Sequence, residues 1–207
     1  MSRSSSTRKT PAAEAPASEG RPWARRFLLG LLVWIVPVAL VWSLLTPYYN
    51  RFLITGAERM LRLTESPAVT RLVPRDHHMA LVTRSDSASA KGFLYSIRVT
   101  DVHFNLLMLG AFFLAVPAVA WRRQLENLGW ATLASVFFHL ISLFLYVKFA
   151  YATQLGDWSL AHYGPASREA WGMAKHVFDL PLKFAWPLLL WAGFYFRELA
   201  PPAADAD

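Results

Sequence analysis

Three histidines are the side chains of this sequence best suited to chemistry. His103, His139 and His176 stand 36 and 37 residues apart. Imidazole is a frequent metal ligand and a general base near neutral pH. A three-histidine metal site normally has carboxylates that orient the rings, or a compact motif such as H-E-x-x-H, and the sequence has neither. We therefore expect no metal and no cofactor, and hydrogen bonding between helices is the favoured role of His139.

A second group of polar residues follows helical spacing. His176, Asp179 and Lys183 occupy positions i, i+3 and i+7, so they share one face of a continuous helix. A histidine oriented by an aspartate is part of a hydrolytic site, but the chain has no cysteine and no G-x-S-x-G motif to supply the nucleophile. Asp179 could instead cap a helix that opens at Pro181. The catalytic and the structural interpretation both stay open.

The composition indicates that these residues lie in a membrane protein. Of 207 residues, 55% are hydrophobic and 17% charged, whereas soluble chains carry about 25% charged residues. The net charge of +7 could indicate a nucleic-acid partner, but the basic residues are scattered among acidic ones instead of forming a stripe. We therefore expect the lipid bilayer as a partner and no nucleic acid.

Four apolar runs are long enough to cross a bilayer. At 1.5 Å per residue, runs of this length span a hydrocarbon core of roughly 30 Å. The sequence thus predicts an all-α membrane protein with four transmembrane helices in a bundle, within one transmembrane domain at 23–199. The short ends at 1–22 and 200–207 are predicted to be disordered tails. The predicted spans lie at about 27–45, 103–121, 128–147 and 180–196.

Flanking arginines predict the orientation. Four spans place both termini on one side, and the positive-inside rule makes that side cytoplasmic in a bacterial inner membrane. The segment 46–102 also has eight basic residues, but it contains five acidic residues as well, and most of its basic residues are far from a span. The arginines that flank the spans on the predicted cytoplasmic side are Arg21, Arg25, Arg26, Arg122, Arg123 and Arg197.

The outer segment 46–102 is too long to be a bare connection and should be folded. Apolar residues in Asn50–Thr64 have helical spacing, which predicts an amphipathic surface helix. We expect the apolar face of this helix to be a candidate partner-binding surface. The residues that form this face are Leu53, Ala57, Met60 and Leu61.

A small hairpin is predicted in the same outer segment. Alternating residues in Phe93–Val99 follow strand period, and Met79–Thr83 is a plausible partner strand. The stretch Ser85–Gly92 would be the turn between them. The sequence thus predicts a two-stranded hairpin that leads into the second span.

The order of these features resembles the exosortase/archaeosortase family of membrane enzymes, which process proteins bearing a C-terminal sorting helix. It is most similar to a small companion of these enzymes, the exosortase H-associated membrane protein. The resemblance covers about 27–196. It rests on the stretch Tyr48–Leu53 after the first span, the strand-like segment before the second, the pair Arg122 and Arg123, and His176 before the last span.

The resemblance also implies what this chain lacks. The enzymes of the family use a Cys, Arg and His triad. Their Cys position should fall within 101–105, where this chain has no thiol, and their Arg position should fall in the third span, which has His139 and no arginine. Only His176 matches the triad in kind.

We therefore expect a non-catalytic accessory membrane protein of an exosortase-type sorting system. It would bind the sorting enzyme or the C-terminal helix of the substrate through the surface helix, the hairpin and a polar mouth around His103, His176 and Asp179. The alternative is a divergent membrane-embedded hydrolase, or a metal-dependent enzyme, that uses His176 and Asp179 with His103 and His139.

Overall fold

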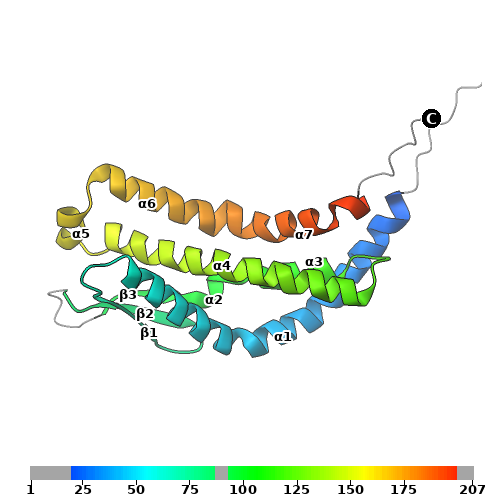
Figure 1. The fold of residues 1–207 in the computed structure, drawn as a ribbon, viewed down its shortest axis with the longest axis horizontal. Coiled ribbons are helices and arrows are strands. Elements are labelled where there is room, and N and C mark those ends of the chain that lie inside the picture. The colour runs from blue at the N-terminus through cyan, green and yellow to red at the C-terminus, as the bar shows by residue number, and fades with distance from the viewer. Residues whose placement is uncertain (1–19, 87–92, 200–207) are drawn as a thin grey trace, which may run out of the picture.

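The computed structural model describes residues 20–86 and 93–199, and the fold is mostly helical (Figure 1). The predicted tails lie outside the described residues, except that 20–22 begin the first helix. Most of the predicted Ser85–Gly92 turn also lies outside them. The elements are α1 (Gly20–Leu63), β1 (Thr70–Pro74), β2 (Met79–Arg84), β3 (Phe93–Arg98), α2 (Val99–Val102), α3 (Asn105–Leu114), α4 (Trp121–Thr153), α5 (Asp157–His162), α6 (Pro165–Val177), the π-helical turn η1 (Phe178–Leu182) and α7 (Lys183–Leu199).

Helix α1 is longer than predicted. Its 44 residues contain both the predicted span 27–45 and most of the predicted surface helix, which are joined without a break. Pro37 and Pro47 lie inside α1, and each removes one backbone hydrogen bond. The Thr46 hydroxyl donates to the carbonyl of Trp42 at 2.7 Å, one turn earlier. The helix changes direction along its length (Figure 1), as helices do at prolines.

Exposed apolar side chains surround one part of the molecule. We call them the belt, and they lie in three stretches: 28–48 of α1, 121–141 of α4, and 177–196 of α6, η1 and α7. Each stretch has about 20 residues, or about 30 Å of helix, which matches the hydrocarbon core of a bilayer. Three helices are long and apolar enough to cross a membrane, at Trp23–Leu63, Trp121–Thr153 and Pro165–Phe196. The protein is therefore a helical membrane protein.

The prediction of four long transmembrane helices is not confirmed. The predicted spans at 128–147 and 180–196 fall inside α4 and inside η1 and α7, but the second predicted span is not a single helix. At 103–121 the structure has only α3, of 10 residues, followed by a turn in which Ala118 has a φ of 65°. Pro117 explains the difference, because its ring disfavours helical backbone in the preceding residue.

The sheet has three strands, where the sequence predicted two. Strands β2 and β3 lie where the hairpin was predicted, and β1 extends the sheet in the antiparallel order β1-β2-β3.

Carboxylates accept hydrogen bonds from the backbone amides on the outer edge of β1. The Leu72 amide donates to Glu58 of α1, and the Thr70 amide donates to Glu65, each at 3.0 Å.

One face of this sheet packs on α1 and α4 and forms the core of a compact unit. We call this unit the head, and it comprises 50–63 of α1, the sheet, 143–153 of α4, α5 and most of α6. Leu53, Ala57 and Leu61 of the predicted partner-binding face are fully buried in the head, and Met60 is half-buried. In this structure, therefore, the chain's own sheet and α4 occupy that face. The buried core residues are Leu53, Ile54, Ala57, Leu61, Leu72, Ala80, Val82, Ile97, Val99, Val102, Leu143, Val147 and Tyr151.

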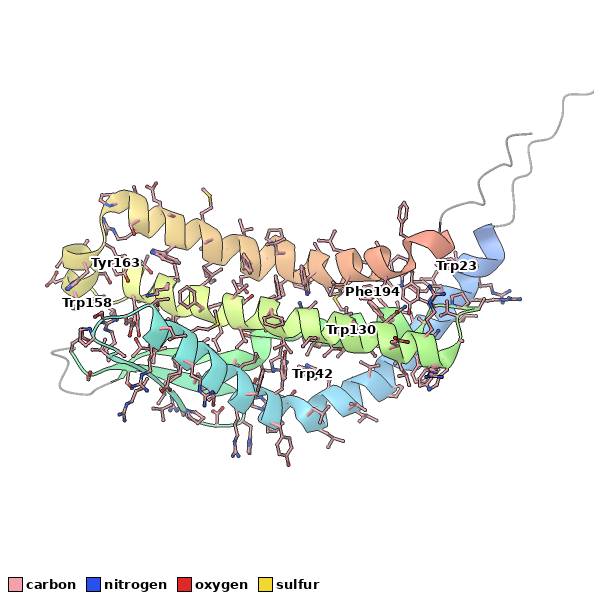
Figure 2. The ribbon with its side chains drawn as sticks, viewed as in Figure 1. Trp23, Trp42, Trp130, Trp158, Tyr163 and Phe194 are labelled. Carbon is pink, nitrogen blue, oxygen red and sulfur yellow. The ribbon has the colours of Figure 1, made fainter. Side chains whose placement is uncertain are left out.

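The remaining helices place the two ends of the described chain together. The start of α1 and the end of α7 lie at one end of the molecule, and the head lies at the other (Figure 1). Figure 2 shows Trp158 and Tyr163 at the head end, Trp23 and Phe194 at the opposite end, and Trp42 at mid-length. Near the ends of the chain, α1 approaches the segment after α3 closely, because Gly30 lies against Ala115.

This close approach gives a first prediction. A Cβ atom on Gly30 would lie 3.0 Å from the carbonyl oxygen of Ala115 and 3.3 Å from its Cα, which are backbone atoms that cannot rotate away. Gly30→Leu should therefore separate α1 from α3 and lower the free energy of unfolding by about 1–3 kcal/mol. Thermal unfolding in detergent measures this. Gly129→Leu is the control, because a Cβ there meets nothing within 4 Å, and an equal loss in both variants would contradict the prediction.

Candidate functional site

Two of the three histidines meet between the belt and the head. His103 lies at the junction of α2 and α3, His139 lies on α4, and both are fully buried. Their ring centroids are 6.3 Å apart, and the Tyr49 ring meets both edge-on. Trp42 and Tyr49 are seven residues apart on α1, so both project from one face of that helix. We call the hydrogen-bonded group built around these rings the histidine network.

The partners of His103 determine the position of its proton. Trp42 Nε1 can only donate, so His103 Nδ1 accepts its hydrogen bond at 3.2 Å. His103 Nε2 then carries the proton and donates to Asn50 Oδ1 at 2.7 Å. The Asn50 amide nitrogen donates in turn to the His77 carbonyl at 2.6 Å and to Thr100 Oγ1 at 3.1 Å. Asn50 thus joins α1 to the loop before β2 and to α2.

His139 has an equally complete set of partners. Its Nε2 donates to Asn105 Oδ1 at 2.8 Å, so its Nδ1 accepts from the Tyr49 hydroxyl, also at 2.8 Å. The Asn105 amide donates to the carbonyl of Lys183 at 3.2 Å. Residue 187 is a proline and has no N–H, so this carbonyl lacks its usual partner in α7. Asn105 therefore supplies a donor that Pro187 cannot.

This arrangement favours a structural role for both rings. All four imidazole nitrogens of His103 and His139 are hydrogen bonded to protein groups, so neither ring has a free lone pair or proton for a substrate. Among residues 20–86 and 93–199, no three His, Asp or Glu side chains are grouped to hold a metal ion. The three-histidine metal centre weighed from the sequence is therefore not formed by the described residues.

The structure places His176 and Asp179 apart from this network. His176 Nδ1 donates to the Gly172 carbonyl at 2.6 Å, and its ring contacts Phe149. Asp179 is paired with Lys175 at 3.0 Å and with Lys183 at 2.8 Å. Both ion pairs join residues i and i+4, so Asp179 and Lys183 share a face, as their spacing predicted, although η1 is π-helical. Asp179 thus pairs with two lysines, whereas the His176 ring is hydrogen bonded to the Gly172 carbonyl.

Four members of the network are not predicted from the sequence. Trp42, Tyr49, Asn50 and Asn105 are all partners of the two histidines. One signal was available, because Asn50 and Asn105 are amides within or beside apolar runs, and polar groups at membrane depth normally have protein partners.

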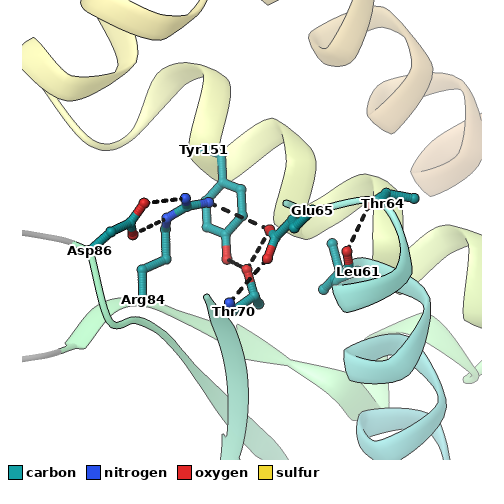
Figure 3. Close-up of polar contacts among 7 residues, drawn as sticks. All are labelled: Leu61, Thr64, Glu65, Thr70, Arg84, Asp86 and Tyr151. Carbon is teal, nitrogen blue, oxygen red and sulfur yellow. Dashed lines mark hydrogen bonds and ion pairs between the residues drawn. The ribbon is translucent and has the colours of Figure 1, made fainter. Parts of the chain in front are cut away.

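The head contains a second polar cluster, centred on Arg84 of β2 (Figure 3). Its guanidinium lies over the rings of both Tyr151 and Trp158, 4.7 and 4.6 Å from their centroids. It pairs with Asp86 at 2.7 Å and with Glu65 at 3.5 Å. The cluster fastens β2 to α4, α5 and the segment after α1.

Glu65 and Thr70 extend the Arg84 cluster. Glu65 accepts hydrogen bonds from the backbone amide and the hydroxyl of Thr70, and the Tyr151 hydroxyl donates to that same Thr70 oxygen at 2.6 Å. Both acids thus have donors. The hydrogen bond from Arg84 also holds the pKa of Asp86 below its usual value.

The histidine network gives a matched pair of variants. Tyr49→Phe removes the donor to His139 Nδ1 and leaves a buried acceptor without a partner, which should lower the free energy of unfolding by about 1 kcal/mol or more. The neighbouring Tyr48 is 73% exposed, so Tyr48→Phe should change the stability little. Thermal unfolding of both variants in the same detergent checks this. Equal stabilities of Tyr49→Phe and wild type would show that the hydrogen bond does not stabilise the fold.

The Arg84 cluster gives a prediction about pH. The folded pKa of Asp86 is depressed, so its contribution is complete above the unfolded value near 3.9 and is lost as the pH falls through the lower folded value. The stability difference between wild type and Asp86→Asn should therefore be constant above about pH 5 and shrink below about pH 4. Chemical unfolding across this range measures it. Asp157→Asn changes an exposed carboxylate outside the cluster and serves as the control, and a difference that does not vary with pH would refute the assignment.

Comparison with known proteins identifies the family. Residues 21–198 match the family described as exosortase H-associated membrane protein. The match runs from the first turn of α1 to the last turn of α7, so it includes both the histidine network and the head. No curated protein and no solved structure matches the chain. The resemblance found in the sequence is therefore confirmed, and the chain belongs to the family of exosortase H-associated membrane proteins.

Proposed function

We propose that this protein is a non-catalytic accessory protein of an exosortase-type sorting system, and that it binds the sorting enzyme in the bacterial inner membrane. The family match carries this proposal, because the family description names an association with an exosortase. The chain crosses the membrane four times, with the short α3 and the turn after it as the second crossing. The head lies outside, and both termini are cytoplasmic.

Three observations support a role without catalysis. The sequence has no cysteine, which excludes a thiol nucleophile in this chain. The nitrogens of His103 and His139 all have protein partners. Asp179, the candidate orienter of His176, is held by two lysines instead. The alternative of a divergent hydrolase would need each of these groups to exchange its present partners.

The distribution of charge supports the orientation. Arg25 and Arg26 of α1 precede the belt, and Arg122 and Arg123 lie in its first turn on α4. The starts of α1 and α4 are at the end of the molecule that also holds the end of α7 (Figure 1). The positive-inside rule assigns this end to the cytoplasm. The first two crossings are then joined on the outside by the sheet of the head.

The head is the surface that we propose for contact with the enzyme. The apolar face of its α1 segment is buried within the chain, so a partner meets the remaining surface of the head. That surface includes exposed arginines on α1 and on the outer face of the sheet, at Arg59, Arg71 and Arg98. A membrane partner with an acidic outer surface would complement it.

A single cysteine tests both the orientation and the partner. The chain has no native cysteine, so Arg59→Cys gives one attachment point for a membrane-impermeant maleimide carrying a photo-crosslinker. In intact spheroplasts that co-express a tagged exosortase-type enzyme, this variant should be labelled and, after illumination, crosslinked to the enzyme. Arg25→Cys should be labelled only after lysis.

Two results would contradict the proposal. Labelling of Arg25→Cys in intact spheroplasts would reverse the orientation. Arg59→Cys and Arg98→Cys variants that are labelled but never crosslinked to the enzyme would refute contact through the head. Crosslinking to the sorting substrate in place of the enzyme would identify the substrate as the partner.

A further inference from the structure

A cavity of about 330 Å³ lies between α1, α3 and α4, on the belt side of the histidine network. On α1 its lining extends from Trp34 to Tyr49, and α3 contributes Gly110. Leu128 and Thr132 line it from α4. The cavity therefore lies at membrane depth, within the part of the molecule that the belt surrounds.

The cavity opens sideways toward lipid. Val41 and Leu45 both line it, yet they are 54% and 55% exposed and belong to the belt. Whatever enters from this side comes from the hydrocarbon of the bilayer, because no water is available there to fill an apolar space.

The polar groups at the outer end of the cavity already have partners. Thr46 donates to the Trp42 carbonyl, Trp42 Nε1 donates to His103, and the Tyr49 hydroxyl is paired with His139. A guest therefore finds an almost wholly apolar lining and no unused donor among these side chains. The lining of the cavity is therefore suited to a hydrocarbon chain and not to a polar ligand.

The volume of the cavity fits a single hydrocarbon chain. An α-helix about 10 Å in diameter and about 22 Å long, which is the rise of α1 from Trp34 to Tyr49, occupies roughly 1,700 Å³. A cavity of about 330 Å³ is several times smaller, so it does not enclose a transmembrane helix of a partner. Since an apolar cavity of about 150 Å³ takes a benzene molecule, this one has room for about a dozen carbon atoms.

We propose that the cavity binds one hydrocarbon chain of a membrane lipid from the leaflet next to the head. The Tyr49 end of the cavity lies at the boundary of the belt next to the head, so the lipid enters from that leaflet. The chain runs along α1 from this end toward Trp34. Its outer part packs against Trp42 and Tyr49, so the bound lipid becomes part of the wall that supports the histidine network.

The test uses the full-length protein in nanodiscs with phosphatidylglycerol whose acyl chain carries a diazirine. After illumination, peptide mapping should place the lipid adducts mainly on the cavity-lining residues of α1, α3 and α4. Thr132→Phe projects a ring into the cavity and should lower this labelling by roughly tenfold or more. Leu133→Phe is the matched control, because Leu133 is the next residue of α4, is exposed in the belt and does not line the cavity; it should label like wild type.

A second variant distinguishes a blocked cavity from a misfolded protein. Thr132→Val keeps the side-chain volume of threonine and should retain the full labelling of the cavity. Equal labelling of Thr132→Phe and wild type, or adducts spread evenly over the belt in the wild type, would overturn the proposal. Because no partner protein is present, the result does not depend on whether the protein binds a sorting enzyme.

Discussion

Hydrocarbon offers no hydrogen bonds, and this constraint determines how the helices of the protein meet. Polar side chains at the boundary of the belt must find partners within the chain. Asn50 and Asn105 meet this need, because each uses its oxygen for a histidine and its nitrogen for a backbone carbonyl. Through these two amides α1, α3, α4 and α7 share one set of hydrogen bonds, and the head is held on the membrane-spanning part.

The prolines show how local backbone chemistry produces this arrangement. Pro117 ends the helical path of the second apolar run, so α3 is only 10 residues long. Pro187 leaves the Lys183 carbonyl without its helical donor, and Asn105 takes that place. A defect in one helix thus becomes a contact between two helices. Another proline, Pro181, lies inside the π-helical turn η1.

The sequence predicted the membrane class and two of the strands, because apolar runs and alternating strands leave local patterns in sequence. The family came from a resemblance to known proteins. It missed β1, whose five residues TRLVP include an arginine and a proline and have little alternation. It also missed the histidine partners, which are between 34 and 90 residues away. No spacing rule joins residues so far apart. Whether His176 and Asp179 take part in chemistry stays a prediction.

The carboxylates on β1 also affect how copies of this protein behave beside one another. A bare strand edge is a template on which a second chain can add a strand, and such stacking leads to aggregation. Here Glu58 and Glu65 hold the outward amides of Leu72 and Thr70, and Pro74 has no amide hydrogen to offer. Crowded neighbours on the membrane surface therefore find this border of the sheet closed to intermolecular β-pairing.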